Sequence, residues 1–209
     1  MARNIKQICA ASFHRYWVLY FLLILLLMAG GIFGTWSATG LAQDQASELQ
    51  DQLTAIFETS GKASLNPTKI FENCLFRNVT LIGFVYIAGL SVIGIPVMLS
   101  LIFVRGFALG FAACLVISRR GLAGIPLVLT SLAPHNLLLI PALVFAGAAS
   151  LSFSLLLIRR GFDPRIPIAR SFWQYTLFTL YATAVVITAA FIESFVTPYL
   201  LQFTLTILE

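Results

Sequence analysis

The stretch Tyr16–Thr35, YWVLYFLLILLLMAGGIFGT, contains no charged residue. A helix of about 20 predominantly apolar residues is long enough to cross a hydrocarbon core of about 30 Å, so this stretch predicts a transmembrane helix. Arg3, Lys6 and Arg15 precede it, and because basic residues favour the cytoplasmic side of a membrane, we expect the N-terminus in the cytoplasm. The alternative is a signal peptide cleaved near residues 40–42, but the apolar run is longer than the core of a usual signal peptide.

The rest of the chain shares this apolar character. Its 209 residues are 59% hydrophobic and 10% charged, with a mean hydropathy of +0.94, whereas about 25% of the residues of an ordinary soluble domain are charged. A water-soluble domain is excluded, because one core could not hide so much apolar surface. The net charge of +5 does not indicate nucleic-acid binding, since the basic residues are scattered between apolar runs. The three cysteines are an odd number and predict no disulfide framework.

The segment 37–77 is the one sizeable stretch that we expect to face water. It carries five of the eight acidic residues, including Asp44, Glu48 and Asp51. Apolar residues recur there at spacings of three and four, which predicts an amphipathic helix with these acids around its other side. We interpret the segment either as a solvated connector or as a docking surface on the outer face, laid on the lipid or against a partner.

Apolar runs, prolines and arginines predict the remaining helices. Asn66-Pro67 is typical of a helix start and leads toward the second span. Gly106–Ser118 is flanked by arginines and is too short to cross, which predicts a short re-entrant or broken helix. Leu122–Ile158 is too long for one crossing, and its prolines predict two helices that turn near residue 135 at the outer leaflet. The predicted crossings are therefore 16–35, 79–104, the two halves of 122–158, and 171–192.

These elements predict an all-α, polytopic transmembrane helical bundle of about five spans, assembled as a homodimer. The arginine pairs 119–120 and 159–160 are both expected in the cytoplasm, and the C-terminus is expected outside. The cytoplasmic arginines also suit anionic lipid, although membrane insertion alone requires them. The predicted parts are 1–36 with the first span, 37–77 as the outer segment, and 78–209 as the membrane core.

Residue patterns for metal or nucleotide chemistry are missing from the sequence. His14 and His135 are the two histidines, and no Cys-x-x-Cys or His-x-x-x-His spacing occurs, so we expect no metal site. There is no glycine-rich phosphate-binding motif, and no serine or aspartate has the partners that intramembrane proteolysis needs. We therefore predict a protein that is not an enzyme and holds no cofactor.

His135 is the polar residue that most needs a partner, because an imidazole in an apolar run costs free energy unless it is hydrogen-bonded. We expect Glu193, at the end of the last span, to approach the same leaflet. One hypothesis is a hydrogen bond between His135 and Glu193 across two helices. The other is a structural histidine bonded to a backbone carbonyl freed by Pro134 or Pro141. A proton relay is a third interpretation, but the predicted spans supply hardly any further titratable groups.

Small residues at helical spacing predict close helix packing. Gly106-x-x-x-Gly110 and Ala146-x-x-x-Ser150 create faces on which two backbones can approach. Such faces serve either packing inside one chain or a homodimer interface. The residues that we assign to one or other of these contacts are Gly94, Pro96, Gly106, Gly110, Ala146 and Ser150.

Several separated motifs also occur in a particular order along the chain. They are Asn78, Gly94-Ile95-Pro96, Gly106-Phe107-Ala108-Leu109-Gly110, Pro134-His135-Asn136, Pro141-Ala142 and Glu193-Ser194-Phe195-Val196-Thr197-Pro198. In this order the chain resembles the stage II sporulation protein M family of small bacterial membrane proteins. The resemblance extends over more than half of the chain and implies five spans with the N-terminus in the cytoplasm.

The residues of these motifs that we assign to a structural or functional polar motif are Pro134, His135, Asn136, Pro141, Glu193, Thr197 and Pro198. Three positions depart from the family pattern. Asn136 replaces the glycine of a usual Pro-His-Gly, Leu139 replaces a glutamate, and Arg105 replaces an asparagine before the Gly-x-x-x-Gly stretch. Without that glutamate, Glu193 is the nearest acid that His135 can be expected to meet.

The function that the resemblance implies is a non-enzymatic scaffold in the bacterial cytoplasmic membrane. It would gather extracytoplasmic cell-wall hydrolases, a lytic transglycosylase and an amidase/endopeptidase, during sporulation. Since no residue pattern here indicates sporulation, we expect a more general envelope role, with Asp44, Glu48 and Asp51 in the docking surface. The alternative is a transporter or channel subunit whose polar path is lined by Arg105, His135 or Asn136.

Overall fold

The computed structural model describes residues 2–40, 67–121, 124–163, 168–197 and 199–200. Within these ranges it contains helices and no strand: α1 (Ala2–Thr39), α3 (Pro67–Gly89), α4 (Gly94–Arg120), α5 (Gly124–Phe162), α6 (Ile168–Phe191) and the π-helix η2 (Ile192–Val196). Five of these helices are long and apolar enough to cross a membrane. The predicted all-α bundle of about five spans is confirmed, while the homodimer stays a prediction.

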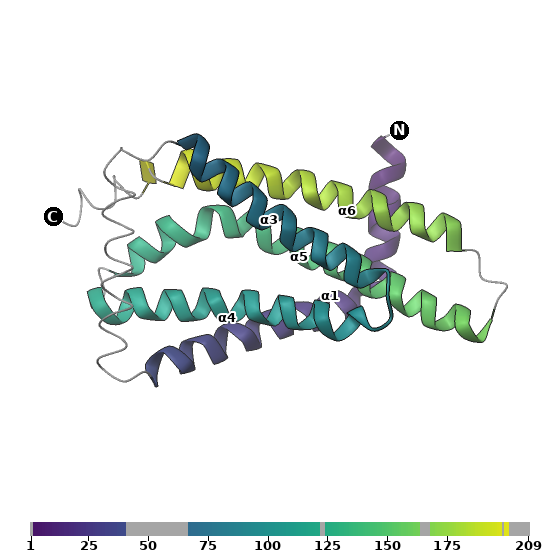
Figure 1. Cartoon of the computed structure of the whole chain (residues 1–209), viewed down its shortest axis with the longest axis horizontal. Coiled ribbons are helices and arrows are strands. Elements are labelled where there is room, and N and C mark those ends of the chain that lie inside the picture. Colours follow the sequence, from purple (N-terminus) through teal and green to yellow (C-terminus); the bar gives the residue numbers. More distant parts are fainter. Residues whose placement is uncertain (1, 41–66, 122–123, 164–167, 198, 201–209) are drawn as a thin grey trace.

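The helix ends gather at two opposite ends of the bundle (Figure 1). The C-terminal ends of α1, α4 and α6 and the N-terminal ends of α3 and α5 lie at the left of this view. The core lies between the helices, and all five long helices contribute fully buried apolar side chains to it, among them Leu23, Ile82, Met98, Ile102, Leu143 and Val186. Large apolar side chains such as Phe21, Met28, Phe84 and Leu180 are exposed, as lipid contact requires.

The second crossing is α3, and its position corrects the prediction. The chain turns at Leu90–Ile93 and then continues as one helix from Gly94 to Arg120. The predicted crossing at 79–104 and the re-entrant helix at 106–118 are therefore wrong. Gly94 allows the tight turn, because a side chain at this position would overlap the backbone carbonyl of Ala88. Pro96 fits the first turn of α4, where its missing N–H has no intrahelical acceptor.

The long apolar run after α4 is a single helix instead of the predicted pair. α5 has 39 residues and contains both Pro134 and Pro141 in its interior. Its length of about 58 Å exceeds the thickness of the hydrocarbon core, and Figure 1 shows it bent. Proline removes one helical hydrogen bond and bends a helix, but here the chain does not reverse. Because α5 crosses once, residues 119–120 and 159–160 lie at opposite ends of the bundle, not together as predicted.

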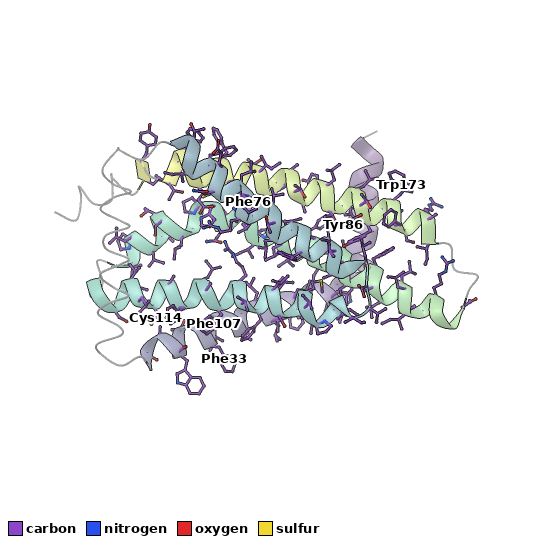
Figure 2. The ribbon with its side chains drawn as sticks, in the orientation of Figure 1. Phe33, Phe76, Tyr86, Phe107, Cys114 and Trp173 are labelled. Atoms are coloured by element: carbon purple, nitrogen blue, oxygen red, sulfur yellow. The ribbon has the colours of Figure 1, made fainter. Side chains whose placement is uncertain are left out.

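α1 and α4 touch through glycines. A side chain at any of four positions would overlap a backbone carbonyl of the other helix: Gly30, Gly34, Gly106 and Gly110. The hydroxyl of Thr35 also donates to the Gly110 carbonyl across this contact, at 3.4 Å. Phe33 and Phe107 lie where the two helices run side by side (Figure 2). The Gly106-x-x-x-Gly110 face is therefore used for packing within one chain.

Side-chain hydroxyls join α3, α5 and α6 close to the C-terminal end of α3. Ser150 Oγ donates to the Val85 carbonyl at 3.0 Å, and Ser154 Oγ donates to the Gly89 carbonyl at 2.9 Å. The hydroxyl of Tyr175 donates to the Tyr86 carbonyl at 2.7 Å, and its ring stacks on that of Tyr86. Ala146 and Ser150 are fully buried in this packing, so their small-residue face also serves contacts inside the chain.

Candidate functional site: a polar cluster inside the bundle

Six polar side chains meet among apolar helices. They come from α3, α4, α5 and η2 and form what we call the central polar cluster: Arg77, Asn78, Arg105, His135, Asn136 and Glu193. Polar and charged groups at membrane depth are rare and are retained where they bind one another or serve a function. This cluster is therefore the candidate site of the molecule.

Glu193 is the carboxylate of the cluster, and its two oxygens bind α3. Arg77 Nη2 donates to Oε1 at 2.6 Å, and Asn78 Nδ2 donates to Oε2 at 3.4 Å. The Arg77 side chain is 59% exposed, whereas that of Glu193 is 16% exposed. The carboxylate thus lies inside the bundle and is paired with an arginine that reaches it from the outer surface.

The π-helix η2 places Glu193 at this position. A π-turn contains more residues than an α-turn and often occurs at functional sites. Ser194 Oγ donates to the Ala190 carbonyl at 2.8 Å, and Thr197 Oγ1 donates to the Ile192 carbonyl at 3.3 Å, so both hydroxyls occupy backbone acceptors of the turn. Phenylalanine rings on either side of Glu193, Phe191 and Phe195, stack on each other and contact Phe71 of α3.

His135 lies beside Glu193 without a hydrogen bond to it. The distance from Nε2 to Glu193 Oε2 is 4.0 Å, which is too long for a hydrogen bond. The side chain is buried, and Nδ1 has no hydrogen-bond partner among the described residues. The second hypothesis, a bond to a carbonyl freed by proline, also finds no such contact in the described structure. The two residues are neighbours, but neither expected hydrogen bond is formed.

Arg105 and Asn136 connect α4 to α5 within the cluster. Arg105 Nη2 donates to Asn136 Oδ1 at 3.1 Å, and Asn136 Nδ2 donates to the Leu132 carbonyl at 2.6 Å. Arg105 Nε is buried and has no partner among the described residues. Arg105 was expected at the end of a span, and Arg77 was not among the residues predicted for the site. For Arg105 the signal that could have found it is a charged residue between two apolar runs, whereas Arg77 ends the polar segment 37–77 and has no such local signal.

A sequence profile of the stage II sporulation protein M family matches residues 23–198. The chain belongs to the stage II sporulation protein M family. No curated protein and no solved structure matches it. The resemblance inferred from the motifs is thus confirmed, and the match includes α3, α4, α5, α6, η2 and the C-terminal part of α1 from residue 23.

Two of the three departures from the family pattern lie in one contact. Arg105 and Asn136 both differ from the residues that the resemblance led us to expect, and they hydrogen-bond to each other. The third departure, Leu139, is fully buried in the apolar core. In this family member the polar motif around His135 is thus completed by a guanidinium group from α4 and a carboxylate from η2.

The remaining assigned residues have varied surroundings. Pro134 and Pro141 lie inside α5, and Thr197 lies directly after η2. The other assigned residues, Pro198 and the three acids Asp44, Glu48 and Asp51, fall outside the described residues. In the parts of the chain that the structure describes, no group of three or more His, Cys, Asp or Glu side chains could hold a metal ion.

Proposed function

We propose that this member of the stage II sporulation protein M family is a non-enzymatic scaffold of the bacterial cytoplasmic membrane. It positions extracytoplasmic peptidoglycan-remodelling enzymes, a lytic transglycosylase and an amidase/endopeptidase, and it acts as a homodimer. The observation that carries this proposal is the family match over residues 23–198. Five apolar helices agree with a multi-pass membrane protein.

The proposed orientation puts the N-terminus and the turn between α3 and α4 in the cytoplasm. Arg159, Arg160 and Arg170 lie at the end of the bundle that this orientation assigns to the cytoplasm, which agrees with the positive-inside rule. α1 ends and α3 begins at the opposite end of the bundle, on either side of the acidic segment in sequence (Figure 1). This arrangement supports an outer location for the acids that we assign to partner docking.

The docking proposal is tested by changing charge within the acidic segment. A triple variant, Asp44→Lys with Glu48→Lys and Asp51→Lys, should insert normally but lose crosslinking to its outer partners in native membranes. Deletion of residues 43–60 should have the same effect. The control is Asp163→Lys, which changes an exposed acid directly after α5, at the opposite end of the bundle. Undiminished capture of the same partners by the triple variant and the deletion would exclude this surface as the docking site.

A transporter or channel subunit is the second candidate function. The observation that favours it is that Arg105, His135 and Asn136, the three residues expected to line a polar path, belong to one cluster within the bundle. The test is solute flux into proteoliposomes that contain the purified protein. A solute flux that depends on Arg105 would support transport. A flux no faster than that of protein-free vesicles would exclude it.

A further inference from the structure

Arg105 is the most unusual charge in the molecule because of its depth. It lies 11 residues after the first residue of α4 and 15 residues before the last. At a rise of 1.5 Å per residue these separations are about 17 and 22 Å, so Arg105 lies well inside the apolar helix α4, far from either end. A guanidinium group at that depth is costly unless an anion or several acceptors surround it.

The cluster does not supply that anion. Two guanidinium groups, those of Arg77 and Arg105, share one carboxylate, and the carboxylate of Glu193 is hydrogen-bonded to Arg77. No described carboxylate lies within 4.0 Å of Arg105. With a neutral His135, the cluster therefore carries one uncompensated positive charge.

The hydrogen bonding of Arg105 is also incomplete. Nε and Nη2 form one edge of the planar guanidinium, and this edge matches the two oxygens of a carboxylate or phosphate. Here Nη2 donates to the single neutral oxygen of Asn136, and Nε has no partner. His135 Nδ1 is also buried without a partner among the described residues, whereas the unpartnered Asn78 Oδ1 is an acceptor and cannot bind an anion.

We propose that the central polar cluster binds a small oxyanion, a carboxylate or phosphate group, on the Nε–Nη2 edge of Arg105. The oxyanion replaces Asn136 Oδ1 as the acceptor and balances the positive charge. This inference does not depend on the scaffold function.

The test is a binding measurement on the full-length protein in a neutral detergent. Radiolabelled inorganic phosphate is titrated at constant ionic strength in chloride, with unlabelled acetate as competitor. We expect saturable phosphate binding that acetate displaces. Arg105→Gln should weaken it by roughly tenfold or more, since a charge-assisted, two-point contact is lost. The matched control, Arg160→Gln, makes the same change at an exposed site near the end of α5 and should bind normally.

A second variant keeps the experiment decisive if Arg105→Gln does not fold. Asn136→Asp places a carboxylate where Asn136 Oδ1 now accepts from Arg105, so the protein supplies its own oxyanion. This variant should also lose phosphate binding although Arg105 is intact. Arg105→Lys keeps the charge but not the two-point edge, and should bind with reduced affinity.

The source of the oxyanion is distinguished in nanodiscs with and without phosphatidylglycerol. Phosphate binding that is unaffected by the lipid identifies a free anion, whereas competition by phosphatidylglycerol identifies the lipid phosphate as the ligand. The proposal is overturned if neither phosphate nor anionic lipid binds saturably. It is equally overturned if Arg105→Gln and Asn136→Asp bind as well as the unmodified protein does.

Discussion

Glu193 shows how one side chain holds several helices together. Its carboxylate accepts hydrogen bonds from Arg77 and Asn78 of α3 and lies 4.0 Å from His135 of α5. It is itself carried by η2, directly after α6. Three segments of the chain therefore depend on one ionised group, and the stabilisation that it gives can be measured.

Glu193→Gln should destabilise the protein modestly. The amide cannot form the charged contact with Arg77, but because that arginine is more than half exposed, solvent screens the pair and the loss should be about 0.5–1 kcal/mol. The measurement is a double-mutant cycle with Arg77→Gln, by reversible unfolding in detergent. If the two substitutions are strictly additive, the ion pair contributes nothing to stability.

Tyr175 is the corresponding residue at the other end of the bundle. Its hydroxyl donates to the Tyr86 carbonyl while its ring stacks on Tyr86 and Phe153. Tyr175→Phe keeps the stacking but leaves the carbonyl with one donor fewer, which should cost about 1 kcal/mol. Tyr181→Phe, on an exposed side chain of the same helix, is the control in the same thermal unfolding assay. Equal effects of the two substitutions would argue against a stabilising hydrogen bond.

Among the elements, α1 and α4 depend on glycine for their contact. Without side chains at Gly30, Gly34, Gly106 and Gly110, each backbone approaches the carbonyls of the other. Close backbone approach is a common way to join helices in lipid, where apolar side chains gain little by leaving the bilayer. The apolar helix α1 is thus held against the bundle mainly by close backbone packing on α4.

Gly110→Ala should separate α1 from α4. The added methyl group would overlap the Gly31 carbonyl, and a rigid backbone cannot yield as a side chain can, so we expect a loss of about 1–3 kcal/mol. Gly83→Ala is the control because no atom lies within 4 Å of the added carbon. There alanine should stabilise the helix by about 0.5–1 kcal/mol. The free energies of unfolding of both variants are compared in the same detergent. If the two alanines change the free energy of unfolding equally, the close contact at Gly110 is excluded.

In its described residues the whole molecule is a bundle of five helices, each long and apolar enough to cross a membrane once. In this arrangement residues 120 and 160 lie at opposite ends, although the distribution of arginines suggested the same side. α4 and α5 are each continuous through the regions where turns were expected. The topology therefore follows from helix continuity, and it gives a distinct labelling pattern.

Cysteine labelling with a membrane-impermeant maleimide checks this topology. The variants are made in a protein without native cysteines. Arg120→Cys should react in intact spheroplasts, in which the reagent reaches the outer face of the cytoplasmic membrane. Ser91→Cys and Arg160→Cys should react only after the membrane is opened. Reaction of residues 120 and 160 from the same side would contradict a single crossing by α5 and support the helical pair instead.

The amino-acid sequence was enough to predict a membrane protein of the all-α class with about five spanning helices. It was also enough to predict the family. These properties depend on the length and apolarity of local runs and on motif order, which a reader of the sequence can measure directly. The predicted topology also brought His135 and Glu193 to the same leaflet, and the structure places them 4.0 Å apart.

Where the chain turns and which polar groups meet depend instead on how the helices pack against one another. Arg105 was taken for a helix end because it is a charge between two apolar runs. Its hydrogen-bond partner, Asn136, lies 31 positions away, and Arg77 meets Glu193 across 116 positions, so neither contact is visible in the local sequence. Prolines 134 and 141 were taken for a turn, yet the helices packed around α5 keep it continuous. A charge or a proline inside a membrane is tolerated when neighbouring helices supply partners and packing, and a local pattern contains no information about those neighbours.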